Sequence, residues 1–98
     1  MKFNLNFTEE AWNQLLNLRA DPSLKKQGKA VQKALAFMEV NLRHSSLHTH
    51  KYESLTKRYE EEIFESYAES NTPAAYRIFW KYGPKKSELT IIAIIPHP

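Results

Sequence analysis

The chain has no cysteine, and this absence excludes disulfides, thiolate nucleophiles and cysteine-based zinc sites. Only two of its 98 residues are glycine, and no glycine-rich phosphate loop is present. The longest apolar run, residues 91–95, is far too short to cross a bilayer, so we expect no membrane association. Residues 1–7 alternate between apolar and polar and lack the apolar segment of a signal peptide, which favours a cytoplasmic location.

The composition is typical of one globular domain over residues 1–98. Apolar residues make up 42% of the chain and charged residues 26%, enough for a modest core without disulfides. Fourteen lysines and arginines against eleven acidic residues give a net charge of +3. This mild excess permits a nucleic-acid partner but does not by itself indicate one.

The amino-terminal part of the chain predicts a strand followed by a helix. Residues 3–7 alternate between apolar and polar side chains, as in a half-buried strand. Thr8 is a typical N-cap residue for a helix over residues 9–20, because its hydroxyl can accept a hydrogen bond from the first turn. The apolar side chains of this helix, Trp12 among them, are expected in the core.

A second helix is predicted to start at Asp21 and Pro22. From Leu24 to Leu42, apolar residues recur at alternating intervals of four and three, which predicts an apolar stripe along one face of this helix. Two helices joined by so short a turn form an antiparallel hairpin, and its apolar stripes need a sheet to cover.

The carboxy-terminal part of the chain predicts strands. Aromatic and β-branched residues on both sides of a Gly83-Pro84 turn predict a hairpin of residues 76–82 and 88–97. Residues 47–55 and 61–68 are also predicted as strands. The last strand is apolar at nearly every position, which is typical of a central strand covered on both faces.

These elements indicate an α+β fold, in which the helical hairpin packs on one face of a mainly antiparallel sheet of four or five strands. The number of strands depends on whether residues 47–55 pair with a neighbouring strand. Along residues 76–82, large apolar side chains alternate with Arg77, Phe79 and Lys81. We therefore expect the apolar set, Trp80 included, to face the helices and the other three residues to lie on a partly open face.

An open face that combines arginine, lysine, histidine and aromatic side chains suits RNA, because cations bind phosphates and rings stack on bases. Arg77 supplies an always-charged donor fork. His97, at the end of the last strand, belongs to the residue type that titrates near neutral pH. If the strands of the hairpin pair, these two residues can share one face. The alternative is that Arg77 forms an ordinary surface ion pair with Glu65 or Glu88.

With these elements the chain resembles the RelE/ParE toxin superfamily, small bacterial proteins made together with an antitoxin. The resemblance rests on the order of strand, two helices and sheet, on the Tyr76-Arg77-Ile78 strand, and on the closing apolar strand that ends in a histidine. It implies a RelE-like endoribonuclease that cleaves messenger RNA in the ribosomal A site without metal or other cofactor. ParE-like members target DNA gyrase, so a non-catalytic protein that binds an antitoxin or inhibits gyrase is the alternative.

The resemblance also implies roles for individual residues. Arg77 matches the arginine of the family's Tyr-Arg strand and would bind the scissile phosphate. His97 matches the position where members hold a histidine or basic residue, and it would serve as general acid or base. Lys51, with His50, lies where some members carry basic residues on an earlier strand. These four residues are the expected catalytic set.

Four further residues are expected to contact RNA. Phe79 and Lys81 extend the open face beside Arg77. Lys25 and Lys29, on the second helix, could follow ribosomal RNA phosphates. The alternative for these two lysines is the solvated side of an amphipathic helix.

The histidines near residue 50 have two interpretations, a metal site or a solvated strand face. His48 and His50 would lie on one face of a strand, close enough to share an ion. Glu53 would point to the other face, and no aspartate lies nearby. Because a metal needs a full ligand set, we predict no metal here.

Overall fold

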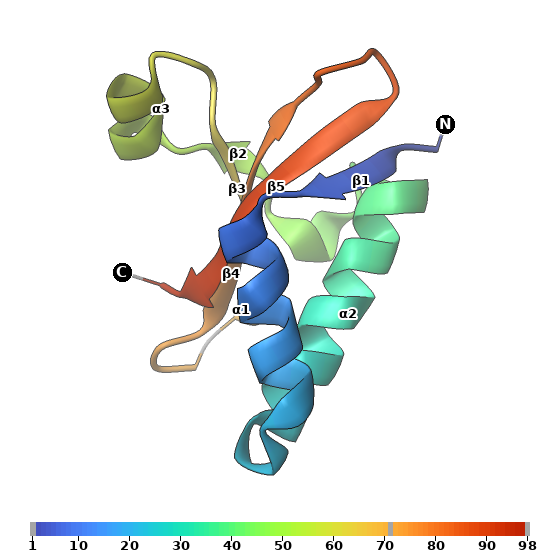
Figure 1. The fold of residues 1–98 in the computed structure, drawn as a ribbon, viewed down its shortest axis with the longest axis vertical. Coiled ribbons are helices and arrows are strands. Elements are labelled where there is room, and N and C mark those ends of the chain that lie inside the picture. The colour runs from blue at the N-terminus through green and yellow to red at the C-terminus, as the bar shows by residue number, and fades with distance from the viewer. Residues whose placement is uncertain (1, 71, 98) are drawn as a thin grey trace.

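A computed structural model describes residues 2–70 and 72–97 of the chain. Within these residues it contains one five-stranded sheet in the spatial order β1-β5-β4-β3-β2, in which β1 runs parallel to β5 and the other neighbours are antiparallel. The strands are β1 Asn4–Phe7, β2 His50–Lys51, β3 Phe64–Tyr67, β4 Tyr76–Tyr82 and β5 Glu88–Pro96. Figure 1 shows a helical hairpin against one side of this sheet. The predicted α+β fold is confirmed, with five strands.

The helices in the described part of the chain are α1 Glu9–Ala20, α2 Lys25–Val40 and α3 Glu53–Tyr59. The first has the predicted bounds, and the Thr8 hydroxyl accepts the expected hydrogen bond from the Ala11 N–H. Short 3₁₀ turns, Pro22–Leu24 and Ser45–Leu47, flank α2. Asp21 caps the first of these turns, so the regular α-helix begins a few residues later than predicted. No helix of the described residues is long and apolar enough to cross a membrane.

The helical hairpin buries its apolar stripe on the sheet face that carries Ile78 and Trp80, both of which are fully buried. Trp80 Nε1 donates a hydrogen bond to Ser66 Oγ at 2.9 Å, so the polar atom of this ring has a partner. The predicted orientation of β4 toward the helices is confirmed. The two helices pack closely at Gly28, where an added Cβ would lie 3.4 Å from the Leu18 carbonyl oxygen.

Trp12 is not a core residue, contrary to the prediction. Its side chain is 44% exposed, and its ring packs edge-on against Phe7 with the centroids 5.4 Å apart. The helix α1 instead turns Ala11, Leu15 and Leu18 into the core. Trp12 lies at the rim of that stripe and not at its centre.

The other face of the sheet is partly covered by α3, which the sequence pattern did not predict. Figure 1 shows this short helix on the side of the sheet away from α1 and α2. The smaller core around it consists of Tyr52, Leu55, Ile63, Phe79, Ile92, Ala93 and Ile95. The sequence predicts a partly open face with Phe79 on its open part, and the structure instead places Phe79 under α3.

The segment 47–55, predicted as one strand, is divided into three pieces. Only His50–Lys51 pairs with β3, while His48 has a left-handed φ of 45° and α3 begins two residues after the strand. Leu47 and Leu55 would point to the same side of a continuous strand. Instead they are buried in cores on opposite faces of the sheet, which a single strand could not achieve.

Candidate functional site

A buried carboxylate, that of Glu65 on β3, lies at the centre of the polar half of this second face. Its side chain is 2% exposed and three basic groups surround it. His50 Nε2 is 2.8 Å from Oε1, His97 Nδ1 is 3.3 Å from Oε2 and Arg77 Nε is 3.6 Å from Oε2. A buried carboxylate is stable when it is paired and hydrogen-bonded, and these groups provide that environment.

The strand register brings these residues together from distant parts of the sequence. His50 pairs with Glu65 across β2 and β3, and Arg77 pairs with Tyr67 two residues further along β3. His97 lies two residues beyond the partner of Arg77 on β5, and its backbone N–H donates to a carbonyl oxygen beside β4 at 2.7 Å. Residues paired across a ladder point to the same face, so these side chains share the face away from α1 and α2.

Arg77 is 7% exposed and is held by the protein on three sides. Its guanidinium lies 3.6 Å from the centroid of the Tyr67 ring, Nη1 donates to the Glu69 carbonyl oxygen, and Nε faces Glu65. Among the described residues Nε makes no hydrogen bond, so its link to Glu65 is electrostatic. The expected open position of Arg77 is wrong. The ion pair with Glu65 is present, but it is buried and does not lie at the surface.

His50 has both ring nitrogens engaged. Nδ1 lies 2.8 Å from the His48 carbonyl oxygen, which can only accept, so Nδ1 carries a hydrogen. Nε2 lies 2.8 Å from Glu65 Oε1, so the second ring nitrogen also faces a protein group. His50 therefore has no ring nitrogen left for a substrate.

His97 has one ring nitrogen engaged and one free. Nδ1 contacts Glu65, the side chain is 49% exposed, and Nε2 has no hydrogen-bond partner among the described residues. A carboxylate bound to one nitrogen of an imidazole fixes the ring and balances the charge that the ring gains when it is protonated. Of the two histidines, His97 is the one whose ring keeps a nitrogen without a contact among the described residues.

The other predicted strand residues do not join this cluster. Lys51 follows His50 along the chain and turns to the other side, with Nζ 3.8 Å from Glu62. Lys81 Nζ pairs with Glu61 at 3.0 Å. Phe79, expected to stack on RNA bases, is 1% exposed beneath α3, so its ring has no face open to a base.

Lys25 and Lys29 lie on α2, the helix that packs on the opposite face of the sheet from Glu65. Both side chains are exposed. Their position matches the solvated side of an amphipathic helix, and they cannot act together with the cluster around Glu65 on one small substrate.

Sequence reasoning named Glu65 only as a possible surface partner of Arg77 and missed its buried, central position. A signal was present, since Glu65 alternates with Ile63 and Tyr67 on one side of a predicted strand. An acidic residue between apolar and aromatic neighbours on a strand face indicates a buried, paired carboxylate. Recognising it required knowing that α3 covers Ile63.

No group of three or more histidine, cysteine, aspartate or glutamate side chains able to hold a metal ion is found among residues 2–70 and 72–97. The His48 backbone accepts from His50, and the His48 ring packs on Tyr67 with the centroids 5.0 Å apart. The His50 ring contacts the same tyrosine, with the centroids 6.1 Å apart.

Comparison with solved structures identifies the fold. The YoeB dimer from Staphylococcus aureus matches with a TM-score of 0.67 at 14% sequence identity. A YoeB/ParE toxin from Agrobacterium tumefaciens matches with a TM-score of 0.70 at 10% identity, and both comparisons cover 100% of each chain. This protein has the fold of these two structures. At these identities the likeness concerns the fold, and no protein-family model or curated protein sequence matches the chain.

Proposed function

We propose that the protein is a RelE-like toxin, a metal-independent endoribonuclease that cleaves messenger RNA on the ribosome and is neutralised by a cognate antitoxin. The observation that carries this proposal is the contact between His97 and the buried carboxylate of Glu65, which leaves one ring nitrogen free for proton transfer. The fold supports it, because one of the similar structures is a YoeB/ParE toxin.

In the proposed reaction the ribose 2′-oxygen bonds to the adjacent phosphorus, while the bond from phosphorus to the 5′-oxygen breaks. The proton of the 2′-hydroxyl passes to water, and His97 Nε2 donates a proton to the departing 5′-oxygen. The products are a 2′,3′-cyclic phosphate and a 5′-hydroxyl end, and His97 regains its proton from solvent. Glu65 holds the other ring nitrogen, so the free nitrogen stays directed at the substrate.

The charges around Glu65 suit an anionic substrate. Arg77 balances the carboxylate, so a proton bound by His97 leaves this part of the face positively charged. Arg77 then acts as a positioning residue that holds Glu65 under His97, in place of the direct phosphate contact expected from the sequence. His50 completes the environment of the same carboxylate.

The antitoxin in this proposal is an acidic, partly disordered peptide. The net charge of +3 and the half-exposed basic groups beside Glu65 favour such a partner. Its binding should weaken as the salt concentration rises.

A non-catalytic protein that binds an antitoxin or inhibits DNA gyrase is the second candidate. The burial of Arg77 favours this candidate, since Arg77 is only 7% exposed and cannot bind a phosphate in its present position. The two candidates differ in whether RNA is cut, and that is directly measurable.

The test is single-turnover cleavage of messenger RNA on programmed ribosomes. The change His97→Ala should lower the rate by about 10²- to 10⁴-fold, the usual contribution of a positioned acid or base. The melting temperature should change little, because the His97 side chain is half exposed. Asn13→Ala, an exposed change on α1, is the matched control and should cleave like the wild type.

The products provide a second criterion. Cleaved RNA should carry a 2′,3′-cyclic phosphate, and a substrate with a 2′-deoxyribose at the cleaved position should remain intact. Undiminished cleavage by His97→Ala would exclude His97 as the proton donor. If the wild type cuts no message on any programmed ribosome, the non-catalytic candidate replaces the enzyme.

A further inference from the structure

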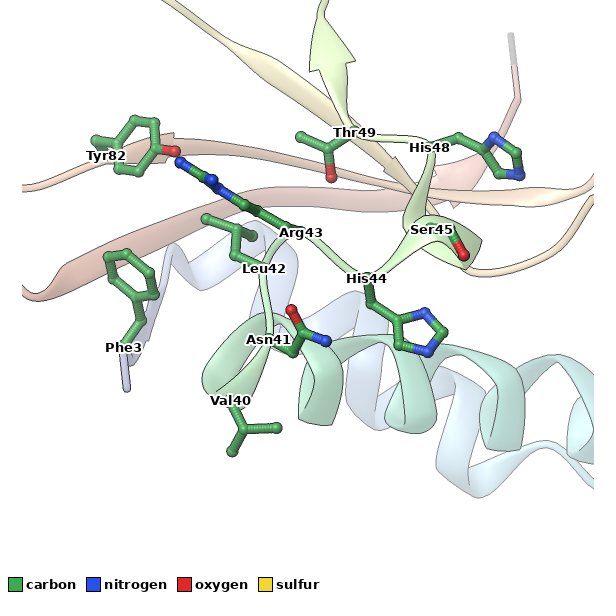
Figure 2. Close-up of a pocket in the computed structure, with 10 residues that line it drawn as sticks. All are labelled: Phe3, Val40, Asn41, Leu42, Arg43, His44, Ser45, His48, Thr49 and Tyr82. Carbon is green, nitrogen blue, oxygen red and sulfur yellow. The ribbon is translucent and has the colours of Figure 1, made fainter. Parts of the chain in front are cut away.

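A large open cavity lies beside the candidate site, where the chain leaves α2 and approaches β2 (Figure 2). Its volume is about 710 Å³, within the range of about 300–1,000 Å³ that is usual for small-molecule sites. It is lined by Phe3, Val40, Asn41, Leu42, Arg43, His44, Ser45, His48, Thr49 and Tyr82.

The lining is basic and contains no acidic residue. Arg43, His44 and His48 supply nitrogen donors, and neighbouring hydroxyl groups supply further polar contacts. Two other cavities of the described chain include an acid, Glu39 in one and Asp21 in the other. The absence of a negative charge makes this cavity suited to an anion.

Two aromatic rings form one end of the cavity. Phe3 and Tyr82 have their ring centroids 6.3 Å apart, and Tyr82 is 54% exposed. In Figure 2 the Arg43 side chain extends toward Tyr82 from the α2–β2 connection. An exposed ring next to a guanidinium is a surface on which nucleic-acid bases stack.

The imidazole end is held in position before any ligand binds. The His44 ring stacks on Phe37 with the centroids 3.8 Å apart, and its Nδ1 contacts Ser46 Oγ at 2.7 Å. This leaves Nε2 of His44 as the nitrogen available to a ligand. A fixed donor costs less ordering on binding than a mobile side chain does.

The cavity and the Glu65 cluster are neighbours. His48 and Thr49 line the cavity, and the next residue, His50, contacts Glu65. The His48 ring also packs against Tyr67, the ring that supports Arg77. The ring of Tyr82, in contrast, packs on Trp80 on the helix-covered face and lies at the opposite end of β4 from Arg77, so only the His48 end of the cavity borders the cluster.

We propose that this cavity is a nucleotide subsite, in which a base stacks on Tyr82 and the phosphate contacts Arg43. The assignment goes beyond the proposed RNA-cleaving function and does not depend on it. An acidic peptide would satisfy the cations but would not need the exposed ring, so the combination favours a nucleotide.

The test is a calorimetric titration of the full-length protein with adenosine 5′-monophosphate. Tyr82→Leu should weaken binding by about 5- to 100-fold, the range expected when one stacked ring is lost. Arg43→Gln should weaken it as well and should reduce the preference for the monophosphate over unphosphorylated adenosine. Tyr59→Leu and Arg58→Gln, exposed residues on α3 away from this cavity, are the matched controls and should bind like the wild type.

Because this measurement needs no cleavage, it is separate from the test of the enzyme. If nucleotide binding depends on Tyr82 and Arg43 but the protein cuts no RNA, the proposed subsite stands and the catalytic proposal is wrong. Two results would overturn the subsite. One is nucleotide binding that is unchanged in both cavity variants while their melting temperatures stay at the wild-type value. The other is a cavity that binds a glutamate-rich peptide but no nucleotide.

Discussion

The two faces of the sheet are equally buried along β4 but are built from different chemistry. Ile78 and Trp80 face the helical hairpin and lie in a conventional apolar core. Their neighbours Arg77 and Phe79 face the other way, one beside the carboxylate of Glu65 and the other beneath the single short helix α3. Alternate residues of one strand therefore serve stability on one side and a polar cluster on the other.

This difference determines how each face should respond to substitution. Removing an apolar side chain from the helix-covered face leaves a cavity, and a second truncation adds to the loss. Removing one member of a buried ion pair leaves the other charge without a partner, and removing both can restore much of the stability. Single and paired substitutions can thus tell the two kinds of burial apart.

The largest expected effect is at the Glu65–Arg77 pair. Glu65→Gln keeps the shape of the side chain but removes the charge that balances a buried guanidinium, and it should lower the free energy of unfolding by about 3–5 kcal/mol. The double change Glu65→Leu with Arg77→Leu should recover most of this loss, because no unpaired charge remains. Urea denaturation of the two variants and the wild type measures both quantities.

The matched comparison on the helix-covered face is Ile78→Ala alone and together with Leu35→Ala, both in the main core. Here the double variant should be less stable than either single variant. If the losses in unfolding free energy at Glu65 and Arg77 also add, the two residues are not coupled. The two faces would then not differ in their response to paired substitutions.

A second prediction compares the two helical covers. Leu35→Ala on α2 should cost about 2–5 kcal/mol, since its side chain is buried in the main core. Leu55→Ala on α3 should cost about 1 kcal/mol, because this side chain is only partly buried in the smaller core. In hydrogen exchange the backbone amides of α3 should open without global unfolding, unlike those of α1 and α2. Equal protection of all three helices would contradict this ranking.

The helix-covered face was largely predictable from sequence, because its signals are periodic and local. The cap at Thr8, the bounds of α1 and the inward side of β4 all follow from residue spacing. The short helix α3 was not predictable in this way, since seven residues form a helix only with support from the rest of the fold.

The site face was predicted less well, because its arrangement depends on contacts between distant parts of the chain. Arg77 and His97 were correctly expected on one face, because strand pairing and alternation determine that arrangement. The environment of these two residues was not predicted. Whether a strand face is open or covered depends on α3 and on strand β2, which is only two residues long. The role of Glu65 as the residue between His50 and His97 emerges only from that tertiary arrangement.

The smallest expected effect concerns Asp21, which caps the turn at the tip of the helical hairpin and touches neither sheet face. Its carboxylate accepts hydrogen bonds from the Ser23 hydroxyl at 2.7 Å and the Ser23 N–H at 2.9 Å, and these bonds lower the pKa of Asp21 below its usual value of 3.8. A pKa that is lower in the folded than in the unfolded chain adds stability above pH 3.8, and this stability is lost as the pH falls through the lowered value. The melting temperature of Asp21→Asn should therefore lie slightly below that of the wild type at pH 6, and the two should converge near pH 2. The histidine ring resonances of the site should be identical in both proteins at pH 6. A shift in those resonances would mean that the hairpin tip and the site face are coupled. A difference in melting temperature that stays constant down to pH 2 would mean that the cap acts through geometry and not through charge.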